Sequence, residues 1–346
     1  MLACSFRTEI TDYCITFDAE NHGIMLKKIR GPVEPEMQRF NELLAENYKN
    51  DNPFISTIVD YVLDQRGKQM RPLLVMLSAA LNGGIQDKSY IGAILVEMAH
   101  TASLVHDDII DEAYMRRGQL SPNAIWRSRT AVLVGDYILA RALSITAKND
   151  AADLLGTLIE SFEKLCEGEL IQLEHASKLD MDEQSYFDVI YRKTASLLGS
   201  AGAIGAQSAG APTEAVNQMK RFGECIGMAF QIKDDLLDYQ PASETGKAAG
   251  NDLKERKITL PLLHLLNNAD EKERKKLINK ISTIRDHEED VAYLQQKVIE
   301  SGAVEYAEKV MQDFEQQALG ILETYPESPI RESLELYCHF ILKRKK

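Results

Sequence analysis

Residues 90–111 read YIGAILVEMAHTASLVHDDIID, and this stretch decides the fold class of the chain. Its apolar residues recur at spacings of three and four, which is the period of one face of an α-helix. Its last five residues read DDIID. Positions i, i+1 and i+4 lie on one side of a helix. The stretch therefore predicts a helix that directs the carboxylates of Asp107, Asp108 and Asp111 at one patch of space.

A second cluster of the same form, DDLLD at residues 234–238, follows the largely apolar run MAFQI. Three like charges crowded on an apolar element are costly unless a cation neutralises them. Mg²⁺ prefers oxygen ligands, often a few carboxylates completed by water and substrate phosphates. One such cluster in an acidic protein is usually a solvated helix face. Two copies in apolar surroundings favour a metal site, with Asp234, Asp235 and Asp238 as its second set of ligands.

The helical period continues through almost every segment after residue 36. The expected helices cover residues 55–63, 72–81, 127–148, 151–175, 184–209, 214–239, 260–266 and 291–323. Turn residues separate them at 82–84, 118–122, 210–212 and 241–250. No convincing alternating pattern predicts a strand. We expect an all-α bundle in which residues 25–346 form a single helical domain, because no linker is long enough to divide it.

Residues 1–24 share no periodicity with the rest, and we expect an N-terminal extension without a folded role. No signal peptide is evident, because Arg7, Glu9 and Asp12 stand where an apolar segment would be needed. The longest uncharged window, residues 194–213, is too weakly hydrophobic for a membrane span. We expect no transmembrane segment, and a closely packed buried helix in that window.

The composition limits the classes of partner. The chain has 40 Lys+Arg against 53 Asp+Glu and a net charge of −13, so bulk electrostatics do not favour nucleic-acid binding. Its five cysteines are scattered and never in CxxC spacing. That pattern argues against a disulfide framework or a zinc site and for a reducing, cytoplasmic location. Cys166 and Cys225 have apolar helical neighbours, and we expect both in the core.

Basic residues stand close to the first cluster and upstream of it. Arg116 and Arg117 follow the acidic residues, and guanidinium groups bind diphosphate oxygens well. Lys68 and Arg71 precede a helix-starting proline. Taken singly, the arginines could merely compensate acidic charge, and the upstream pair could be an ordinary helix N-terminus.

Seven motifs in order resemble those of the trans-isoprenyl (polyprenyl) diphosphate synthases. They are GKQMRP at 67–72, HTASLVHDDIID with RRG at 100–118, GELIQ at 168–172, RKTA at 192–195, GMAFQIKDDLLD at 227–238, GK at 246–247 and NDLKERKITLP at 251–261. The resemblance covers the chain from about residue 25 to its C-terminus. It implies an all-α homodimer in which the two acidic helices face each other across a deep central cavity. It also implies a cluster of Mg²⁺ ions, with isopentenyl diphosphate and an allylic diphosphate as substrates.

The resemblance also assigns roles to single residues. Among the six metal-binding aspartates, Asp107, Asp111 and Asp234 are the best candidates for direct ligands. The residues that match the allylic diphosphate site are Arg116, Lys193 and Lys247. Those that match the isopentenyl diphosphate pocket are Lys68, Arg71, His100 and Arg117. Thr194 and Gln231 match polar groups near the reacting carbons, and Lys257 matches a base that closes over the leaving group.

Small residues before the first cluster indicate the product length. Helical side chains point toward the N-terminus, so residues one turn before Asp107 lie beneath the metal site. Ala102 and Ser103 stand there, where family members with short products tend to have Phe or Tyr. We therefore predict a medium- or long-chain product of the kind attached to quinone rings. Alternatively, both residues only pack helices, and a deeper aromatic such as Phe162 stops the chain.

The expected reaction is an all-trans, head-to-tail condensation that releases diphosphate. The alternatives are a short-chain (farnesyl or geranylgeranyl) synthase and a catalytic or non-catalytic subunit of a heteromeric synthase. A terpene cyclase shares the metal-triggered ionisation but would normally lack Lys68, Arg71 and Arg117. A non-catalytic subunit would usually lose aspartates that this chain keeps. A purely structural helical protein would not need bases at this spacing.

Overall fold

The computed structural model describes residues 23–239, 250–284, 287 and 289–342, and this part of the chain is almost entirely helical, as predicted. Its elements are η1 (Gly31–Val33), α2 (Glu34–Tyr48), α3 (Pro53–Asp64), α4 (Met70–Leu81), α5 (Asp87–Ile110), β1 (Met115–Arg116), β2 (Gln119–Leu120), α6 (Pro122–Lys148), α7 (Asp153–Lys178), α8 (Glu183–Ile190), η2 (Tyr191–Ala195), α9 (Ser196–Ser208), α10 (Thr213–Leu237), α12 (Asn251–Lys254), α13 (Leu260–Asn268), α14 (Glu271–Ser282), α15 (Glu289–Glu300), α16 (Ala303–Leu322) and α17 (Pro329–Leu342). Lys247 and residues 1–22 lie outside the described residues.

Helix α9 forms the centre of the bundle and packs against α4, α5, α7 and α10. Its sequence, SLLGSAGAIGAQS, is rich in small residues, and nearly all of them are buried. A Cβ atom at Gly202 would stand 2.2 Å from the carbonyl oxygen of Met219 in α10. Only glycine fits this close approach, which brings the two backbones into contact. The prediction of a closely packed buried helix within residues 194–213 is confirmed.

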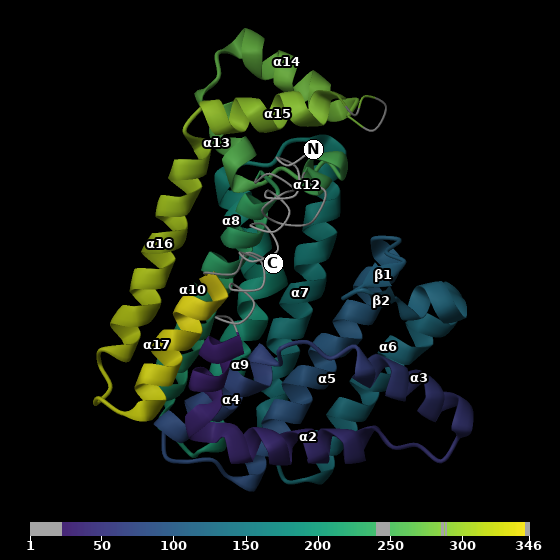
Figure 1. Cartoon of the computed structure of the whole chain (residues 1–346), viewed down its shortest axis with the longest axis vertical. Coiled ribbons are helices and arrows are strands. Elements are labelled where there is room, and N and C mark those ends of the chain that lie inside the picture. The colour runs from purple at the N-terminus through teal and green to yellow at the C-terminus, as the bar shows by residue number, and fades with distance from the viewer. Residues whose placement is uncertain (1–22, 240–249, 285–286, 288, 343–346) are drawn as a thin grey trace, which may run out of the picture.

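The remaining helices surround this centre (Figure 1). Helix α16 packs along α10, and α17 packs against both α16 and α4. Helices α14 and α15 lie across one end of the molecule, and α2 crosses the opposite end. The hairpin β1–β2 and helix α6 project on the side away from α16. The two helices that carry the acidic clusters, α5 and α10, both belong to the inner part of the bundle and pack on α9.

Several local expectations differ from the structure. The helix expected at 184–209 is interrupted by the π-helical turn η2, and the one expected at 291–323 is divided at Gly302, where φ is 75°. Two-residue strands pair Met115 with Leu120, too short to produce an alternating pattern. Cys225 is buried as expected, but the expectation for Cys166 is wrong, because its side chain is exposed on α7.

Candidate active site

The first acidic cluster lies at the C-terminal end of α5, and its carboxylates have different surroundings. Asp108 is buried and accepts a charge-assisted hydrogen bond from Arg116 Nε at 2.7 Å. Asp107 is half-buried and Asp111 exposed, and neither side chain forms a hydrogen bond with the described residues. Burial, reinforced by the nearby Glu169 carboxylate, raises the pKa of Asp107 to about 6. Two of the three carboxylates thus remain available to a ligand.

The second cluster lies at the end of α10 and is held by uncharged donors. Asp235 is buried and accepts hydrogen bonds from Tyr186 Oη at 2.7 Å and Gln231 Nε2 at 3.0 Å. Asp238 accepts bonds from the backbone N–H groups of Asn251 and Asp252 at the start of α12. Burial and the Asp252 carboxylate raise the pKa of Asp235 to about 8. Asp234 is partly exposed at the same end of the helix.

Lys193 and Thr194 are presented by the π-helical turn η2 (Tyr191–Ala195). A Cβ atom at Gly168 of α7 would stand 3.0 Å from Lys193 N, and one at Gly227 of α10 would stand 2.4 Å from Ala195 Cα. These two glycines let both helices close on the turn. Such π turns occur often at functional sites. The periodicity of apolar residues in a sequence does not reveal such turns.

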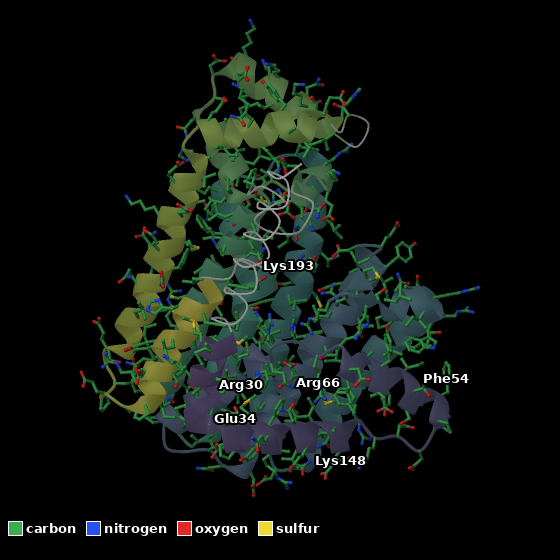
Figure 2. The ribbon with its side chains drawn as sticks, viewed as in Figure 1. Arg30, Glu34, Phe54, Arg66, Lys148 and Lys193 are labelled. Atoms are coloured by element: carbon green, nitrogen blue, oxygen red, sulfur yellow. The ribbon has the colours of Figure 1, made fainter. Side chains whose placement is uncertain are left out.

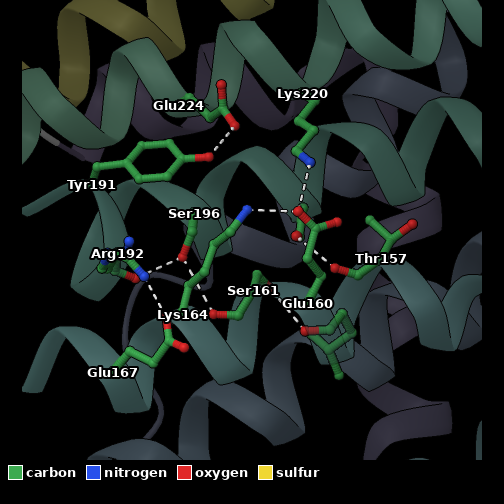
Figure 3. A network of polar contacts seen from close by, with 12 residues as sticks. Thr157, Glu160, Ser161, Lys164, Glu167, Tyr191, Arg192, Ser196, Lys220 and Glu224 are labelled. Carbon is green, nitrogen blue, oxygen red and sulfur yellow. Dashed lines mark hydrogen bonds and ion pairs between the residues drawn. The ribbon is translucent and has the colours of Figure 1, made fainter. Parts of the chain in front are cut away.

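A polar network fixes the same turn from outside (Figure 3). The Arg192 guanidinium forms ion pairs with Glu167 on α7 and Asp188 on α8. Tyr191 Oη donates to Glu224 of α10 at 3.0 Å. Because three helices hold the residues around it, Lys193 occupies a defined position near the middle of the molecule (Figure 2).

Lys193 connects the turn to α7 and to the first cluster. Its Nζ pairs with Glu169 at 2.6 Å and donates to Gln172 Oε1 at 3.0 Å. Its positive charge also lowers the pKa of Asp107, although burial outweighs this effect. The sequence analysis quoted the motif that contains Glu169 and Gln172 but assigned neither residue a role. The available signal was a charged and a polar residue three positions apart, which lie on one side of a helix.

A partly open cavity adjoins the second cluster. It is lined by four of the predicted site residues, Lys193, Gln231, Asp235 and Lys257. His175, Asp252 and Arg256 line it too, and the sequence analysis missed all three. Burial lowers the pKa of Lys257, but its bond to Glu255 and the charges of Asp252 and Asp111 outweigh burial and raise it. Lys257 therefore interacts with acidic groups from both cluster regions.

A second partly open cavity adjoins the first cluster. His100, Asp108, Arg116 and Arg117 line it, as do Arg66 and Glu97, which the sequence analysis did not single out. Arg71 Nη1 donates to His100 Nε2 at 2.9 Å. Burial, and then the positive charges of Arg71, Arg117 and Arg116, lower the pKa of His100 well below its ordinary range. Lys68 does not line this cavity, and its Nζ lies 5.1 Å from the Phe340 ring centroid.

The hairpin β1–β2 carries Arg116 and Arg117 and is fastened to the end of α3. Arg117 Nη1 donates to the carbonyl oxygen of Gln65 at 2.6 Å. The carbonyl oxygen of Leu120 accepts two hydrogen bonds, from Tyr61 Oη and Gln65 Nε2, both at 2.7 Å. These contacts position two arginines whose segment has little regular structure of its own.

The two residues expected to set product length are buried in α5. Ala102 is fully buried, and Ser103 donates its hydroxyl to the carbonyl oxygen of His100 at 2.8 Å. Neither lines the two cavities described above. Phe162, the alternative floor, is partly buried against the hydrophobic core.

The described side chains do not enclose a metal site by themselves. Within residues 23–239, 250–284, 287 and 289–342, no three His, Cys, Asp or Glu side chains lie close enough together to hold an ion by themselves. The available carboxylates are hard oxygen donors of the kind Mg²⁺ takes. Because Mg²⁺ usually completes its shell with water and substrate phosphates, one or two carboxylates from each cluster are sufficient. The residues therefore fit Mg²⁺ bound together with a diphosphate.

Comparison with known proteins gives the same assignment. The polyprenyl synthetase family model matches residues 52–298. The chain is 34% identical over 291 residues to a short chain isoprenyl diphosphate synthase of Methanothermobacter thermautotrophicus, covering 83% of this chain and 89% of the relative. It is 33% identical to octaprenyl diphosphate synthase of Haemophilus influenzae, covering 89% and 94%.

A solved structure adds the fold. Polyprenyl synthase from Caulobacter crescentus CB15, complexed with calcium and isoprenyl diphosphate, superposes with a TM-score of 0.86 at 31% identity, covering 93% of this chain and 98% of that one. The chain therefore belongs to the polyprenyl synthetase family of trans-isoprenyl diphosphate synthases, enzymes that transfer prenyl groups.

Proposed function

We propose that the chain catalyses the Mg²⁺-dependent, all-trans, head-to-tail condensation of isopentenyl diphosphate with an allylic diphosphate, releasing diphosphate. The observation that carries this proposal is the pair of cavities, one beside each acidic cluster, each combining carboxylates with bases. The reaction uses two diphosphate substrates, so it needs two anion-binding sites. Only one of the two substrates, the allylic diphosphate, is to ionise. Lys193 and Lys257 line one cavity, and His100 and Arg117 line the other together with Arg116, which supports that division for four of these five bases.

Asp107, Asp111 and Asp234 are the proposed Mg²⁺ ligands. Asp108, Asp235 and Asp238 accept hydrogen bonds from other groups of the protein. They are proposed to orient the neighbouring Mg²⁺ ligands and to add negative charge around the metal site. When bound, Mg²⁺ neutralises the charge of the departing diphosphate, so that the allylic C–O bond can ionise. The crystal structure of the Caulobacter polyprenyl synthase is a complex with calcium and isoprenyl diphosphate, which supports a metal–diphosphate site of this kind.

The remaining predicted residues act on the two substrates. Lys193, Lys257 and Arg116, with Lys247 outside the described residues, are proposed to hold the allylic diphosphate. Lys68, Arg71, His100 and Arg117 are proposed to hold isopentenyl diphosphate away from the metals. Gln231 receives a bond from Thr194 Oγ1 at 2.8 Å and donates to Asp235, so the orientation of its amide is fixed, which supports the proposed role of both residues near the reacting carbons. No side-chain nucleophile is required, because the alkene of one substrate attacks the cation of the other.

We propose that two copies associate through α6 and α7. These helices and the hairpin between α5 and α6 expose large apolar side chains, namely Ile110, Tyr114, Met115, Leu120, Ile125, Val132, Leu133, Ile159, Leu170 and Leu173. By length and hydropathy, α6 alone among the described helices could cross a membrane, and 39% of its apolar window is buried. A second copy of the chain is the proposed cover for this face.

Leu133→Glu should yield monomers in light scattering, whereas a native chain that is itself monomeric would refute the dimer.

The product is proposed to be a medium- or long-chain polyprenyl diphosphate for a quinone side chain, made in the cytoplasm. The small side chains of Ala102 and Ser103 beneath Asp107 support a long tunnel. Ala102→Phe should shorten the extracted product, with Ala45→Phe, at an exposed position of α2, as a control for the effect of an added phenyl group. An unchanged product distribution in a folded Ala102→Phe variant would leave Phe162 as the better candidate for the floor.

One assay tests the whole proposal. The purified chain is incubated alone with labelled isopentenyl diphosphate, farnesyl diphosphate and Mg²⁺, and the extracted product is sized. A ladder beyond 20 carbons supports the long-chain synthase, and a product that stops at 20 carbons, after one addition to the farnesyl primer, supports the short-chain alternative. A cyclic hydrocarbon would indicate a cyclase. Activity that appears only with a second polypeptide would indicate a heteromeric synthase.

A further inference from the structure

The short helix α12 (Asn251–Lys254) ends in a turn that places an arginine where glycine is usual. Lys257 N–H donates to the carbonyl oxygen of Asp252 at 2.8 Å, and Arg256 N–H donates to that of Leu253 at 2.9 Å. This pair of bonds defines a Schellman motif, which puts the residue after the cap in the left-handed conformation. Arg256 has a φ of 59° there. A residue with a Cβ atom is disfavoured in this conformation, so the arginine is kept against a backbone preference.

The Arg256 side chain lines the cavity beside the second acidic cluster, with Lys193 and Lys257. Its Nε atom is buried and has no hydrogen-bond partner among the described residues. A buried guanidinium nitrogen without a partner is costly, because it has lost water and gained nothing in exchange. A strained residue with an unsatisfied donor at a cavity wall is the pattern expected of a ligand-binding group.

The other bases of this cavity already have acidic partners. Lys193 pairs with Glu169 at 2.6 Å, Lys257 with Glu255 at 2.5 Å and His175 with Asp180 at 2.7 Å. Arg256 forms no ion pair within the part of the chain that the structure describes, and this includes the cavity's own carboxylates, Asp235 and Asp252. Arg256 therefore adds positive charge that no described acid compensates.

We propose that Arg256 binds a diphosphate group, namely the one that the allylic substrate carries and then releases. A guanidinium offers several N–H donors in a planar fork that matches phosphate oxygens. Because Arg256 and Lys257 belong to one Schellman turn, the turn supplies two adjacent cations to the same cavity wall. This inference rests on the proposed function, since it assigns one more residue to the allylic diphosphate.

The charge is tested with Arg256→Gln, which keeps a long polar side chain but removes the cation. The KM for the allylic diphosphate should rise about tenfold, and the inhibition constant of inorganic diphosphate should rise by a similar factor. The KM for isopentenyl diphosphate should stay unchanged, because none of its proposed bases lines this cavity and two of them, His100 and Arg117, line the other one. Arg256→Lys should recover part of the loss.

A purely conformational role is tested with Arg256→Gly and Asp150→Gly. Asp150 is an exposed residue with a φ of 52° in the connection between α6 and α7, so it is a matched left-handed position outside the site. Both variants should have a Tm no lower than that of the native chain, because glycine suits the conformation. Only Arg256→Gly should show the tenfold loss of diphosphate binding.

The outcomes separate the two proposals. If the native chain forms no prenyl product, the proposed function fails. If the native chain is active and Arg256→Gln keeps both constants within twofold of native values, the function stands and the role of Arg256 is refuted.

Discussion

The two acidic clusters have the same spacing but are held by different kinds of partner. At the first, the middle carboxylate, Asp108, is held by the cation of Arg116, which arrives on a two-stranded hairpin. At the second, Asp235 is held by the neutral Tyr186 hydroxyl and the Gln231 amide, both on helices. The first cluster therefore depends on a short hairpin outside the helical bundle. The second is built into the helical core.

The difference extends to protonation. Burial raises the pKa of Asp107 at the first cluster to about 6, and that of Asp235 at the second to about 8. Asp252, beside the second cluster, has its pKa raised to about 6 by burial and by Asp238. Without a cation, the second cluster therefore retains protons more strongly. A metal ion that binds there must displace them, so metal affinity should increase with pH.

The largest expected effect tests what the clusters have in common. Asp107→Ala and Asp234→Ala should each lower kcat by about 10²–10³-fold, because each removes a proposed ligand of the ions that stabilise the leaving diphosphate. Steady-state turnover at saturating Mg²⁺ measures this. Asp313→Ala, which removes an exposed carboxylate on the outer helix α16, is the matched control and should keep the native rate. If either cluster variant keeps more than a tenth of the native kcat, that aspartate is not a ligand.

The second prediction tests how the clusters differ. Asp235→Ala should destabilise the metal-free chain by about 2–3 kcal/mol, because the buried Tyr186 hydroxyl and the Gln231 amide lose an acceptor. Asp108→Ala should cost about 1 kcal/mol or less, because the partly exposed Arg116 can return to water. Urea unfolding at one pH measures both changes. Equal losses would show that the two clusters are held in the same way.

The third prediction concerns the cavity beside the first cluster, where a histidine rather than a carboxylate is perturbed. The pKa of His100 is lower in the folded chain than its ordinary value of about 6.5, because of burial and the neighbouring Arg71. Its neutral form is favoured by folding, so stability should fall as the pH drops below about 6.5, by up to about 1.4 kcal/mol per pH unit.

His100→Gln removes this titration while its amide oxygen can still accept from Arg71, so the variant should lose that slope between pH 7 and pH 5. Glu97 in the same cavity acts in the opposite direction. Burial raises its pKa, so its contribution declines as the pH rises. Glu97 contributes equally in the native chain and in His100→Gln. The difference between their two curves of unfolding free energy against pH therefore isolates His100. Parallel curves would show that the imidazole is not buried in its neutral form.

Much of the first cluster was predictable from the sequence, because its helix has a clear period and its acids and arginines are neighbours in the chain. The period of α5 predicted its burial, and Arg116 stood five residues after Asp111. The partners of the second cluster were harder to find. Tyr186 lies 49 residues before Asp235 and reaches it only through tertiary packing. A tyrosine on an amphipathic helix gives no signal of that contact.

The π turn and the left-handed Arg256 escaped prediction for a different reason. A π turn inserts one residue into a helix without changing its composition, so the pattern over residues 184–209 predicted one continuous helix. Arg256 occupies a position where glycine would have signalled the turn, and the chain gives no such signal. Sequence patterns thus locate the regular elements, whereas departures from regular geometry need the coordinates.

The smallest expected effect tests whether the first cluster depends on its hairpin. Tyr61 and Gln65, one turn apart on and just after α3, both donate to the Leu120 carbonyl oxygen, so either bond can hold the hairpin when the other is lost. Tyr61→Phe and Gln65→Leu should therefore each raise the KM for the allylic and isopentenyl diphosphates by about twofold. The double variant should raise it by more than the product of the two single effects, because contacts that share one acceptor are not independent. The kcat should change little in all three, since the metal ligands stay in place. Independent effects in this cycle would mean that the hairpin is fixed elsewhere, and that Arg116 and Arg117 are positioned by the acidic cluster itself.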